Sequence, residues 1–560
     1  MTPAPSHTLA TPEAPANALA LARTPAPEAH EPAPEARQPA PEHAAMPRTT
    51  PEHATPSLCP APPADVPPLD VAAKAVYMIG IGGCGMSGLA RMLRARGAAV
   101  SGSDMTPSDA TDALMAEGVA VGFDQSRAWI PDDTALVVAS AAVRPEHPQV
   151  RAAAARGVPV LSYAQALGRS MIGRTGVAIA GTHGKSTTTA MLSAVLCDAG
   201  IDPTVIVGAT CAQLGGAVGG GGGAAPAGFR LGAERIAAGS MRGAPGVVLA
   251  EACEFNRSFL NFRPSLAAIN AVEADHLDIY GTLDEVVRAF GQFARLVAPA
   301  HEGGLLIIAH QGAHRREVTA GVGARVLTIG ASSAADLTVW HDPATGRCAL
   351  SGSHDGAPRR TLCQWTAQMP GEHNATNAAT AAALALALGA DAEVVGRSLS
   401  AFAGVDRRCQ FLGEQRLASG GSVRVYDDYG HHPTEVDTTL RALRRAESPE
   451  SRGGRIVCVF QPHQHSRTRH LLEEFARSFE AADVVIVPHI YFVRDSQEER
   501  SLVSAADLVD RLRQRGVRAM HLYPFEAIVE QLRAVCRDGD VVVVMGAGPV
   551  YQVARGFMQP

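Results

Sequence analysis

Short apolar runs recur along the chain from Ala75 to Met545, and segments with helical patterning separate them. Strands buried in a parallel sheet have this form, because crossover helices cover both faces of such a sheet. The pattern therefore predicts an α/β fold built from several strand–helix units. The predicted strands are Ala75–Ile79, Ala98–Ser101, Ala135–Ala141, Val177–Ala180, Val205–Val207, Val247–Ala250, Leu266–Ile269, Ile456–Phe460, Val484–Val487 and Val541–Met545.

Changes in composition divide the 560 residues into a tail and three blocks. Residues 1–72 are rich in proline and alanine and hold too few large apolar groups to offset chain entropy, so we expect a disordered extension. The three α/β blocks are predicted to span residues 73–169, 170–403 and 404–560. Within the second block, residues 215–246 contain five consecutive glycines, and we expect a flexible insertion without regular structure.

Charge and cysteine usage exclude several classes of function. The formal net charge is −6 and no basic run is present, which argues against a nucleic-acid partner. Ten scattered cysteines without a CxxC pair indicate a reduced, cytoplasmic setting, in which Cys84 and Cys253 are packing residues. No apolar stretch reaches the roughly 20 residues that cross a bilayer, and the N-terminus lacks a basic-then-apolar signal pattern. We expect a soluble cytoplasmic protein without a membrane partner.

A glycine-rich loop follows the first predicted strand and precedes a helical segment. Its sequence is Gly80-Ile-Gly82-Gly83-Cys84-Gly85-Met86-Ser87-Gly88. Gly80, Gly82 and Gly85 match the dinucleotide-binding fingerprint, and Asp104 lies 19 residues after Gly85. Backbone amides and the helix N-terminus in such a loop face a diphosphate. A nicotinamide dinucleotide and a nucleotide sugar both fit this pattern, and a tight turn without a ligand is the alternative.

A second glycine loop lies between the strand Val177–Ala180 and a helical run that extends to Cys197. Its sequence is Gly181-Thr182-His183-Gly184-Lys185-Ser186-Thr187, and the Gly-Lys-Ser core is typical of a phosphate loop. The loop is shorter than the common form, which has a glycine at the position of Ile179. We expect the backbone amides to hold the phosphates of ATP, Lys185 to reach the outer phosphates and the Ser186 hydroxyl to ligate Mg²⁺. A ligand-free turn is the alternative.

Acidic residues follow two further predicted strands. Glu251 comes directly after Val247–Ala250, and Glu273-Ala-Asp275-His276 follows the strand that begins at Leu266. Because carboxyl ends of parallel strands meet at one edge, we expect these groups beside the phosphate loop. Mg²⁺ prefers oxygen ligands, so Glu251 is the expected one. Capping of the next helix by Asp275 and His276 is the alternative.

Two polar motifs mark the end of the second block. Asn374 and Asn377 lie three residues apart at the start of an alanine-rich helix and share a helix face, so their amides fit an adenine edge. Helix capping by Asn374 is the alternative. Arg407 and Arg408 lie near the junction with the third block, where an arginine can stabilise a transferring phosphoryl group. A surface ion pair is the alternative.

Polar residues also follow three strands of the third block. One dense group is Asp427-Asp428-Tyr429-Gly430-His431-His432-Pro433-Thr434-Glu435, for which helix capping by Thr434 is the alternative. Another follows Ile456–Phe460 and places Arg467 where an anionic substrate fits. Gly546–Pro549 ends the last strand, and an ordinary turn explains it equally simply.

Taken in order, these segments resemble the Mur ligases over roughly Lys74 to Pro560. The matching segments are Gly80–Gly88, Gly181–Thr189, Glu251–Glu254, Glu273–Asp278, His373–Asn377, Arg407–Arg408, Asp427–Glu435 and Gln461–Thr468. The form of Gly80–Gly88, and the absence of a lysine between His276 and Pro299, are similar to the members that add alanine. Departures from the usual family residues are Ser186, Cys253, Cys409, Gln464, His465 and Pro549, and none of them removes a group that the chemistry needs.

The resemblance implies a Rossmann-like N-terminal domain, a central phosphate-loop ATPase-type α/β domain and a C-terminal Rossmann-like α/β domain. It implies ATP- and Mg²⁺-dependent ligation of L-alanine to the lactyl carboxylate of UDP-N-acetylmuramate, through an acyl phosphate, by a monomer or homodimer. Three substrates held by three domains further imply an open and a closed form.

The resemblance also implies roles for individual residues. The UDP-substrate residues are Gly80, Gly82, Gly83, Gly85, Met86, Ser87, Asp104 and Arg467. The ATP residues are Gly181, Thr182, His183, Gly184, Lys185, Ser186, Thr187, Asn374, Asn377 and Asp428. Tyr429 and His431 belong to the amino-acid site, and the metal ligands are Ser186, Glu251 and His276. The catalytic set is Lys185, Glu251, His276, Arg408 and His431.

Three rival interpretations make different predictions. A nicotinamide-dependent dehydrogenase explains Gly80–Gly85 and Asp104 but leaves the Gly-Lys-Ser loop unexplained. A non-catalytic nucleotide-binding protein predicts the loss of catalytic groups, whereas Lys185, Glu251 and His276 are present. A related ligase that uses another amino acid or a recycled murein peptide is the nearest rival, and the form of Gly80–Gly88 argues against it.

Overall fold

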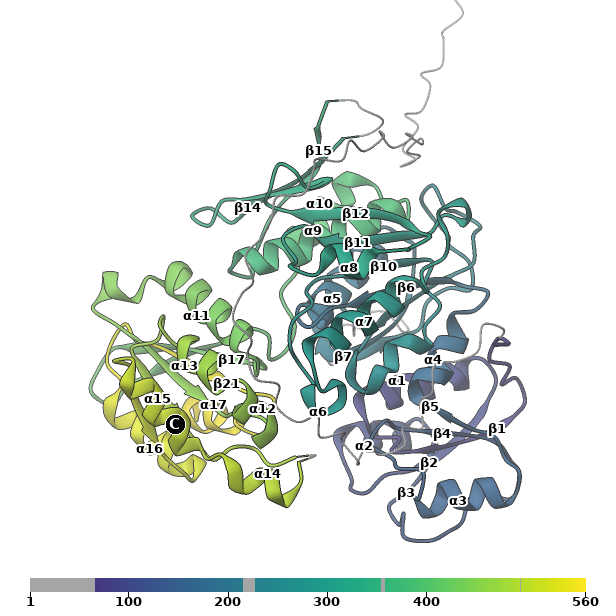
Figure 1. Cartoon of the computed structure of the whole chain (residues 1–560), viewed down its shortest axis with the longest axis horizontal. Helices are drawn as coiled ribbons and strands as arrows, with labels where there is room; N and C mark the ends of the chain where they lie inside the picture. The colour runs from purple at the N-terminus through teal and green to yellow at the C-terminus, as the bar shows by residue number, and fades with distance from the viewer. Residues whose placement is uncertain (1–65, 215–226, 354–357, 494, 560) are drawn as a thin grey trace, which may run out of the picture.

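The computed structural model describes residues 66–214, 227–353, 358–493 and 495–559. Three sheets follow one another along the chain, and Figure 1 shows the three α/β units in purple-blue, teal and green-to-yellow. This arrangement confirms the predicted α/β fold. The expected disorder of the tail concerns residues that lie almost entirely outside the described part. None of the helices in the described ranges is long and apolar enough to span a membrane.

The N-terminal sheet has five parallel strands in the order β3-β2-β1-β4-β5. Its elements are β1 (Ala75–Ile79), α1 (Cys84–Ala95), β2 (Ala99–Ser103), α2 (Asp109–Ala116), β3 (Ala120–Gly122), β4 (Thr134–Ala139), α3 (Pro148–Ala155), β5 (Val160–Ser162) and α4 (Tyr163–Met171). The strand order reverses between β1 and β4. The loop Gly80–Gly88 therefore borders the crevice where such sheets bind ligands.

The middle sheet has ten strands in the order β15-β14-β13-β12-β11-β10-β6-β9-β7-β8. Its elements are β6 (Thr175–Ala180), α5 (Lys185–Asp198), β7 (Thr204–Cys211), η1 (Ala212–Leu214), β8 (Ala227–Arg230), β9 (Val247–Glu251), η2 (Phe255–Asn261), β10 (Leu266–Ile269), α6 (Leu277–Tyr280), α7 (Leu283–Ala294), η3 (Ala300–Glu302), β11 (Leu305–Ala309), α8 (Arg315–Thr319), β12 (Arg325–Gly330), β13 (Leu337–His341), β14 (Arg347–Gly352), β15 (Arg360–Thr366), α9 (Glu372–Ala387) and α10 (Ala392–Ser400). The parallel strand β6 lies between β10 and β9, so the loops after all three strands end side by side.

The C-terminal sheet has six strands in the order β16-β17-β21-β18-β19-β20, and only β16 is antiparallel to its neighbour. Its elements are β16 (Gln410–Arg416), β17 (Ser422–Asp428), α11 (Pro433–Glu447), η4 (Pro449–Arg452), β18 (Ile456–Phe460), α12 (His465–His470), α13 (Leu472–Arg477), β19 (Val484–Val487), α14 (Gln497–Leu502), α15 (Ala505–Gln514), β20 (Arg518–His521), α16 (Phe525–Val535), β21 (Val541–Met545) and α17 (Tyr551–Met558).

One apolar core runs from the N-terminal unit into the middle unit. It joins Met78 and Leu89 of the first to Phe259 and Phe290 of the second. Helix α4 lies so close to η2 that a Cβ atom on Gly168 would stand 2.0 Å from the carbonyl oxygen of Asn261, so only glycine fits there. The C-terminal unit has separate cores, whose buried members run from Cys409 to Phe557.

The sequence prediction did not include the antiparallel strands, and it also lacked the parallel strands β3, β5, β11, β12 and β20. Strand β8 lies inside residues 215–246, so the expectation that this stretch holds no regular element is wrong for Ala227–Arg230. The strand forms because it pairs with β7 and because Phe229 packs over Gly88 of α1, where an added Cβ would lie 3.1 Å from the Phe229 side chain. The glycine run itself lies outside the described residues.

Candidate active site between the middle and C-terminal units

The phosphate loop joins β6 to α5, as predicted. Gly181 has φ +131° and an added Cβ would lie 2.9 Å from backbone nitrogens of Asn270 and Ala271. Gly184 has φ +77°, and its Cβ would meet the Asn377 amide oxygen at 2.4 Å. Both positions therefore require glycine. The loop also contacts the adjacent strand end through the Thr182 hydroxyl, which accepts a hydrogen bond of 2.9 Å from the backbone N–H of Glu273.

Lys185 is buried in this loop beside a carboxylate. Its Nζ donates to the carbonyl oxygen of Gly181 at 2.6 Å and lies 2.8 Å from Oε2 of Glu254. Burial alone would lower the pKa of Lys185, but the Glu254 carboxylate holds it well above its ordinary value. Lys185 is therefore charged, and Glu254, to which the sequence assigned no role, is its partner.

A candidate Mg²⁺ site lies next to the lysine. The Ser186 hydroxyl donates to the Glu251 carboxylate, 3.0 Å from Oε2, and the Gly208 backbone N–H donates to the same oxygen at 2.9 Å. A hydroxyl and a carboxylate at this spacing are the hard oxygen donors that Mg²⁺ takes. The residues present therefore fit the ion that the sequence predicted.

His276, which follows β10, has a strained backbone conformation. Its φ is +52°, and its buried Nδ1 has no hydrogen-bond partner among the described residues. Ligand atoms of Glu254, Asp275 and His276 all lie within 4.8 Å of one another. Although His276 stands at the N-cap position of α6, its side chain makes no capping hydrogen bond, so capping does not account for the imidazole. An unpaired buried nitrogen beside two carboxylates fits a second metal ion.

The two asparagines of α9 lie against the phosphate loop. Asn377 accepts a hydrogen bond from the Thr188 hydroxyl at 3.3 Å, and Asn374 donates one of 2.8 Å to the carbonyl oxygen of Pro370. Gly371, not Asn374, is the N-cap of α9, so the capping alternative is not what the structure shows. Both asparagines line a cavity of 260 Å³ together with His183, Thr187 and Arg408. Their adenine contacts remain a prediction.

The two neighbouring arginines differ in what they contact. Arg407 stays within its own unit, where it pairs with Asp427 at 3.2 Å. Arg408 reaches the middle unit, with Nη2 3.5 Å from the Ser186 hydroxyl. Both guanidinium groups lie 5.0 Å from the centre of the Tyr429 ring. Arg408 is therefore the arginine that reaches the helix after the phosphate loop.

The other predicted residues of β17 and its loop lie beside Arg408. Asp428 is buried and accepts a hydrogen bond of 2.7 Å from the backbone N–H of Cys409, and burial raises the pKa of Asp428 to about 6. Burial lowers the pKa of His431 to about 4, so its imidazole is neutral at pH 7. Its ring centre lies 5.6 Å from that of Tyr429.

Arg467 forms a buried ion pair across the two units. Its Nη2 lies 2.9 Å from Oδ1 of Asp275, and the side chains are 6% and 7% exposed. The Arg467 guanidinium holds the pKa of Asp275 well below its ordinary value despite burial. The sequence predicted that Arg467 contacts a substrate anion, and in this structure a protein carboxylate takes that contact. The substrate role stays a prediction.

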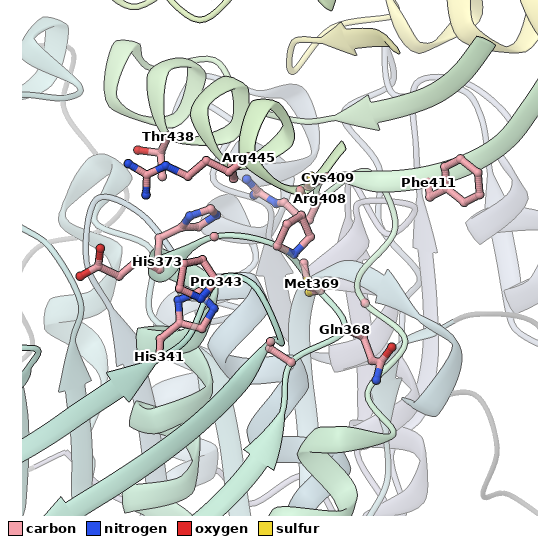
Figure 2. Close-up of a pocket in the computed structure, with 18 of the residues that line it drawn as sticks. His341, Pro343, Gln368, Met369, His373, Arg408, Cys409, Phe411, Thr438 and Arg445 are labelled. Carbon is pink, nitrogen blue, oxygen red and sulfur yellow. The ribbon is translucent and has the colours of Figure 1, made fainter. Parts of the chain in front are cut away.

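A larger cleft of 1170 Å³ opens next to the 260 Å³ cavity, and His373 and Arg408 line both. Figure 2 shows His341 and Pro343 projecting from one wall and Arg445 and Thr438 from the helix opposite, α11. The phosphate loop lines the smaller cavity through His183, Gly184 and Thr187, and the larger cleft beside it is wide enough for a nucleoside.

The first glycine loop lies in the N-terminal unit. The backbone N–H of Gly82 donates a hydrogen bond of 2.7 Å to Oδ2 of Asp104, and this bond joins the loop to the end of β2. Gly85 contacts Tyr163 closely, since an added Cβ would lie 2.6 Å from the phenol oxygen. The Met86 side chain is buried in the apolar core, so only its backbone can face a ligand. Ser87 is buried as well.

Three family models together cover most of the chain. They are the Mur ligase family catalytic domain at residues 75–175, the Mur ligase middle domain at 179–385 and the Mur ligase glutamate ligase domain at 407–548.

The chain belongs to the Mur ligase family.

As a Mur ligase the protein is an ATP-dependent ligase, and the predicted three-domain fold is confirmed. Among similar proteins, a UDP-N-acetylmuramate--L-alanine ligase of Kineococcus radiotolerans is 40% identical over 85% of this chain and 94% of its own length. A protein of the same name from Agathobacter rectalis is 35% identical over 86% and 97%. The crystal structure of UDP-N-acetylmuramate-alanine ligase MurC from Thermotoga maritima has a TM-score of 0.64 at 24% identity, covering 86% of this chain and 98% of that one.

Proposed function

We propose that this Mur ligase joins L-alanine to the lactyl carboxylate of UDP-N-acetylmuramate, using ATP and Mg²⁺. The observation that carries the proposal is the pair of relatives at 35% and 40% identity, matched over 97% and 94% of their lengths and both named for this reaction. The form of Gly80–Gly88 and the absence of a lysine between His276 and Pro299 agree with it. We propose that the enzyme acts in the cytoplasm as a monomer or homodimer.

The reaction needs activation of a carboxylate. The γ-phosphoryl group of ATP passes to a carboxylate oxygen, which gives an acyl phosphate and ADP. The alanine amine then attacks the acyl carbon, and phosphate leaves as the amide forms. No enzyme nucleophile is needed, so the protein acts by positioning the substrates and by offsetting charge on the phosphoryl group.

Residues of two units would share the work on the phosphates. Lys185 lies on the phosphate loop, and we infer that a γ-phosphate oxygen replaces its partner Glu254 when ATP binds. Arg408, 3.5 Å from the Ser186 hydroxyl, would approach the same phosphates from the C-terminal unit. Ser186 and Glu251 would hold one Mg²⁺ and His276 would contact a second, and these ions supply positive charge against the phosphates.

The remaining predicted residues would hold the other substrates. Gly80–Gly88 and Asp104 would bind the UDP part in the N-terminal unit. Asn374, Asn377 and Asp428 would hold the nucleotide, and Tyr429 and His431 the amino acid. Arg467 would contact a substrate anion only after releasing Asp275.

The nearest alternative is a ligase of a recycled murein peptide. A structure of a murein peptide ligase from Psychrobacter arcticus has a TM-score of 0.62 at 24% identity, covering 87% of this chain and 98% of that one. The fold alone therefore leaves both substrates open, and a direct assay has to separate them.

The deciding experiment measures phosphate release with ATP, Mg²⁺ and UDP-N-acetylmuramate while single amino acids or the murein tripeptide are added in turn. We expect release to depend on L-alanine. Equal release with and without L-alanine, or faster release with the tripeptide, would overturn the proposal. The variant Lys185→Ala is the control, because any phosphate that appears in its presence comes from a source other than this reaction.

A further inference from the structure

The phosphate loop carries a histidine whose ring lies between carboxylates from two units. Nδ1 of His183 lies 3.2 Å from Oε1 of Glu435, which is in the C-terminal unit. Nε2 lies 3.4 Å from Oε2 of Glu273, which is in the middle unit. The side chains of His183 and Glu435 are only 16% and 14% exposed. Residues 252 positions apart in the chain thus meet at the phosphate loop.

The partners of His183 determine its charge. Ionised carboxylates only accept hydrogen bonds, so both ring nitrogens of His183 must donate and the ring is an imidazolium. Burial alone would lower the pKa of His183, but Glu273 and Glu435 raise it to about 9.

The neighbouring histidines are neutral. The His432 ring is 4.7 Å from that of His183, with Nε2 3.2 Å from the Ala274 carbonyl oxygen and Nδ1 3.3 Å from the Thr434 backbone N–H. The carbonyl oxygen requires a proton on Nε2, and the backbone N–H requires a bare Nδ1, so the ring carries one proton. Burial also lowers the pKa of His432. Burial also lowers the pKa of His373, which faces His183, to about 4. The two carboxylates therefore share a single imidazolium.

Glu435 connects this imidazolium to the arginine of the active site. Its Oε2 accepts hydrogen bonds from the backbone N–H groups of His431 and His432, and the bond from His432 belongs to the capping box of α11. Its Oε1 is left for His183 and for Arg408, whose Nη1 lies 3.8 Å away. Oε2 of Glu435 therefore caps the N-terminus of α11, and Oε1 links this helix to the middle unit.

We propose that His183 is a positioning residue that couples the phosphate loop to the C-terminal unit and so holds Arg408 over the bound phosphates. The inference rests on the proposed function, which gives Arg408 its partner. Without the imidazolium, Glu273 of the middle unit and Glu435 of the C-terminal unit would face each other as like charges.

A metal ion is the competing occupant of this cluster, since ligand atoms of His183, Glu273 and His432 lie within 4.8 Å of one another. The contacts favour the imidazolium, because Nδ1 of His432 already accepts a backbone hydrogen bond and both nitrogens of His183 face carboxylates. Metal analysis of the purified protein therefore belongs to the test.

The test compares His183→Gln, which removes the charge, with His183→Lys, which keeps a cation. We expect His183→Gln to lower kcat by about 10- to 100-fold, as the loss of charge-assisted hydrogen bonds predicts, with little change in the Kd of an ATP analogue. His183→Lys should recover most of kcat. Glu435→Gln keeps the capping box but loses the ion pair, so it should lower kcat similarly, and combining it with His183→Gln should add little.

Small-angle scattering supplies a readout that needs no alanine. With ATP analogue and Mg²⁺, the wild type and His183→Lys should be more compact than His183→Gln. His314→Gln is the matched control, because His314 makes a similar 3.2 Å contact with Glu317 on the surface. If the wild type shows no alanine-dependent phosphate release, the proposed function fails, while scattering still tests the coupling.

Three results would overturn the coupling itself: Gln and Lys variants that match the wild type in scattering and turnover, equal losses in both variants, or a stoichiometric metal ion that His183→Gln removes.

Discussion

Removing the amino group of Lys185 should abolish turnover and also destabilise the middle unit. The structural reason is Glu254, whose side chain is 3% exposed and whose carboxylate lies 2.8 Å from Nζ of Lys185. In Lys185→Ala this buried carboxylate has lost its cation. The substitution therefore tests the ion pair and the catalytic role at once.

The size of the loss follows from that burial. Breaking a buried ion pair by removing one partner typically costs about 3–5 kcal/mol. Protonation limits the cost, because neutralising a glutamate with an ordinary pKa of about 4.3 takes about 3.7 kcal/mol at pH 7 and about 1 kcal/mol at pH 5. We expect a loss of about 3–4 kcal/mol at pH 7, which lowers Tm by about 6–16 °C for a domain of this size. A buried acid that prefers its neutral form destabilises only above its unfolded pKa, so the loss shrinks as pH falls.

The assay is thermal unfolding of the wild type, Lys185→Ala and Lys185→Ala/Glu254→Gln at pH 7 and pH 5. The double variant should regain most of the stability at pH 7 but none of the turnover, because glutamine removes the stranded charge and restores no phosphate ligand. A wild-type Tm in Lys185→Ala at pH 7, or a loss that is as large at pH 5, would refute the reasoning.

Three further predictions concern other contacts. Asp275→Asn leaves the buried Arg467 without its partner and should weaken the contact between the middle and C-terminal units by about 3 kcal/mol. The weaker contact should appear as a larger radius of gyration, and an unchanged radius would contradict the role of the ion pair. Ser186→Ala should raise the Mg²⁺ concentration for half-maximal activity by about 10-fold or more, which is the loss typical even of an outer-sphere partner. Ser186→Thr keeps the hydroxyl and should not raise it. Equal Mg²⁺ titrations of Ser186→Ala and the wild type would show that Ser186 is not a ligand. Gly168→Ala places a Cβ 2.0 Å from the carbonyl oxygen of Asn261, so it should lower stability by about 1–3 kcal/mol, and a wild-type Tm would show that α4 shifts freely.

Local sequence was sufficient for the ten parallel strands that were predicted and for the phosphate loop, whereas the parallel strands β3, β5, β11, β12 and β20 were missed. The runs Ala75–Ile79 and Leu266–Ile269 coincide with β1 and β10, because strands covered on both faces are continuously apolar. The edge strand β15 has alternating exposure along Arg360–Thr366, which is a weaker signal, and it was missed. The strand–loop–helix order at Lys185 is also local, which is why the loop between β6 and α5 was predicted.

Contacts between distant segments were the part that sequence could not supply. Glu254 lies three residues after Glu251, so a search for a second acidic group near the predicted metal ligand could have found it. Glu435 had no such signal, because a glutamate at the third position of a helix looks like an ordinary capping-box residue. Its contact with His183 depends on how two folded units dock.

The two joints of this protein differ in kind. Between the N-terminal and middle units the apolar core is continuous, so parting them would expose hydrocarbon to water. Between the middle and C-terminal units the described contacts at the site are hydrogen bonds and ion pairs, which water can replace at small net cost. We therefore expect heat to unfold the first two units as one cooperative block, and we expect any opening and closing around the substrates to occur at the polar joint.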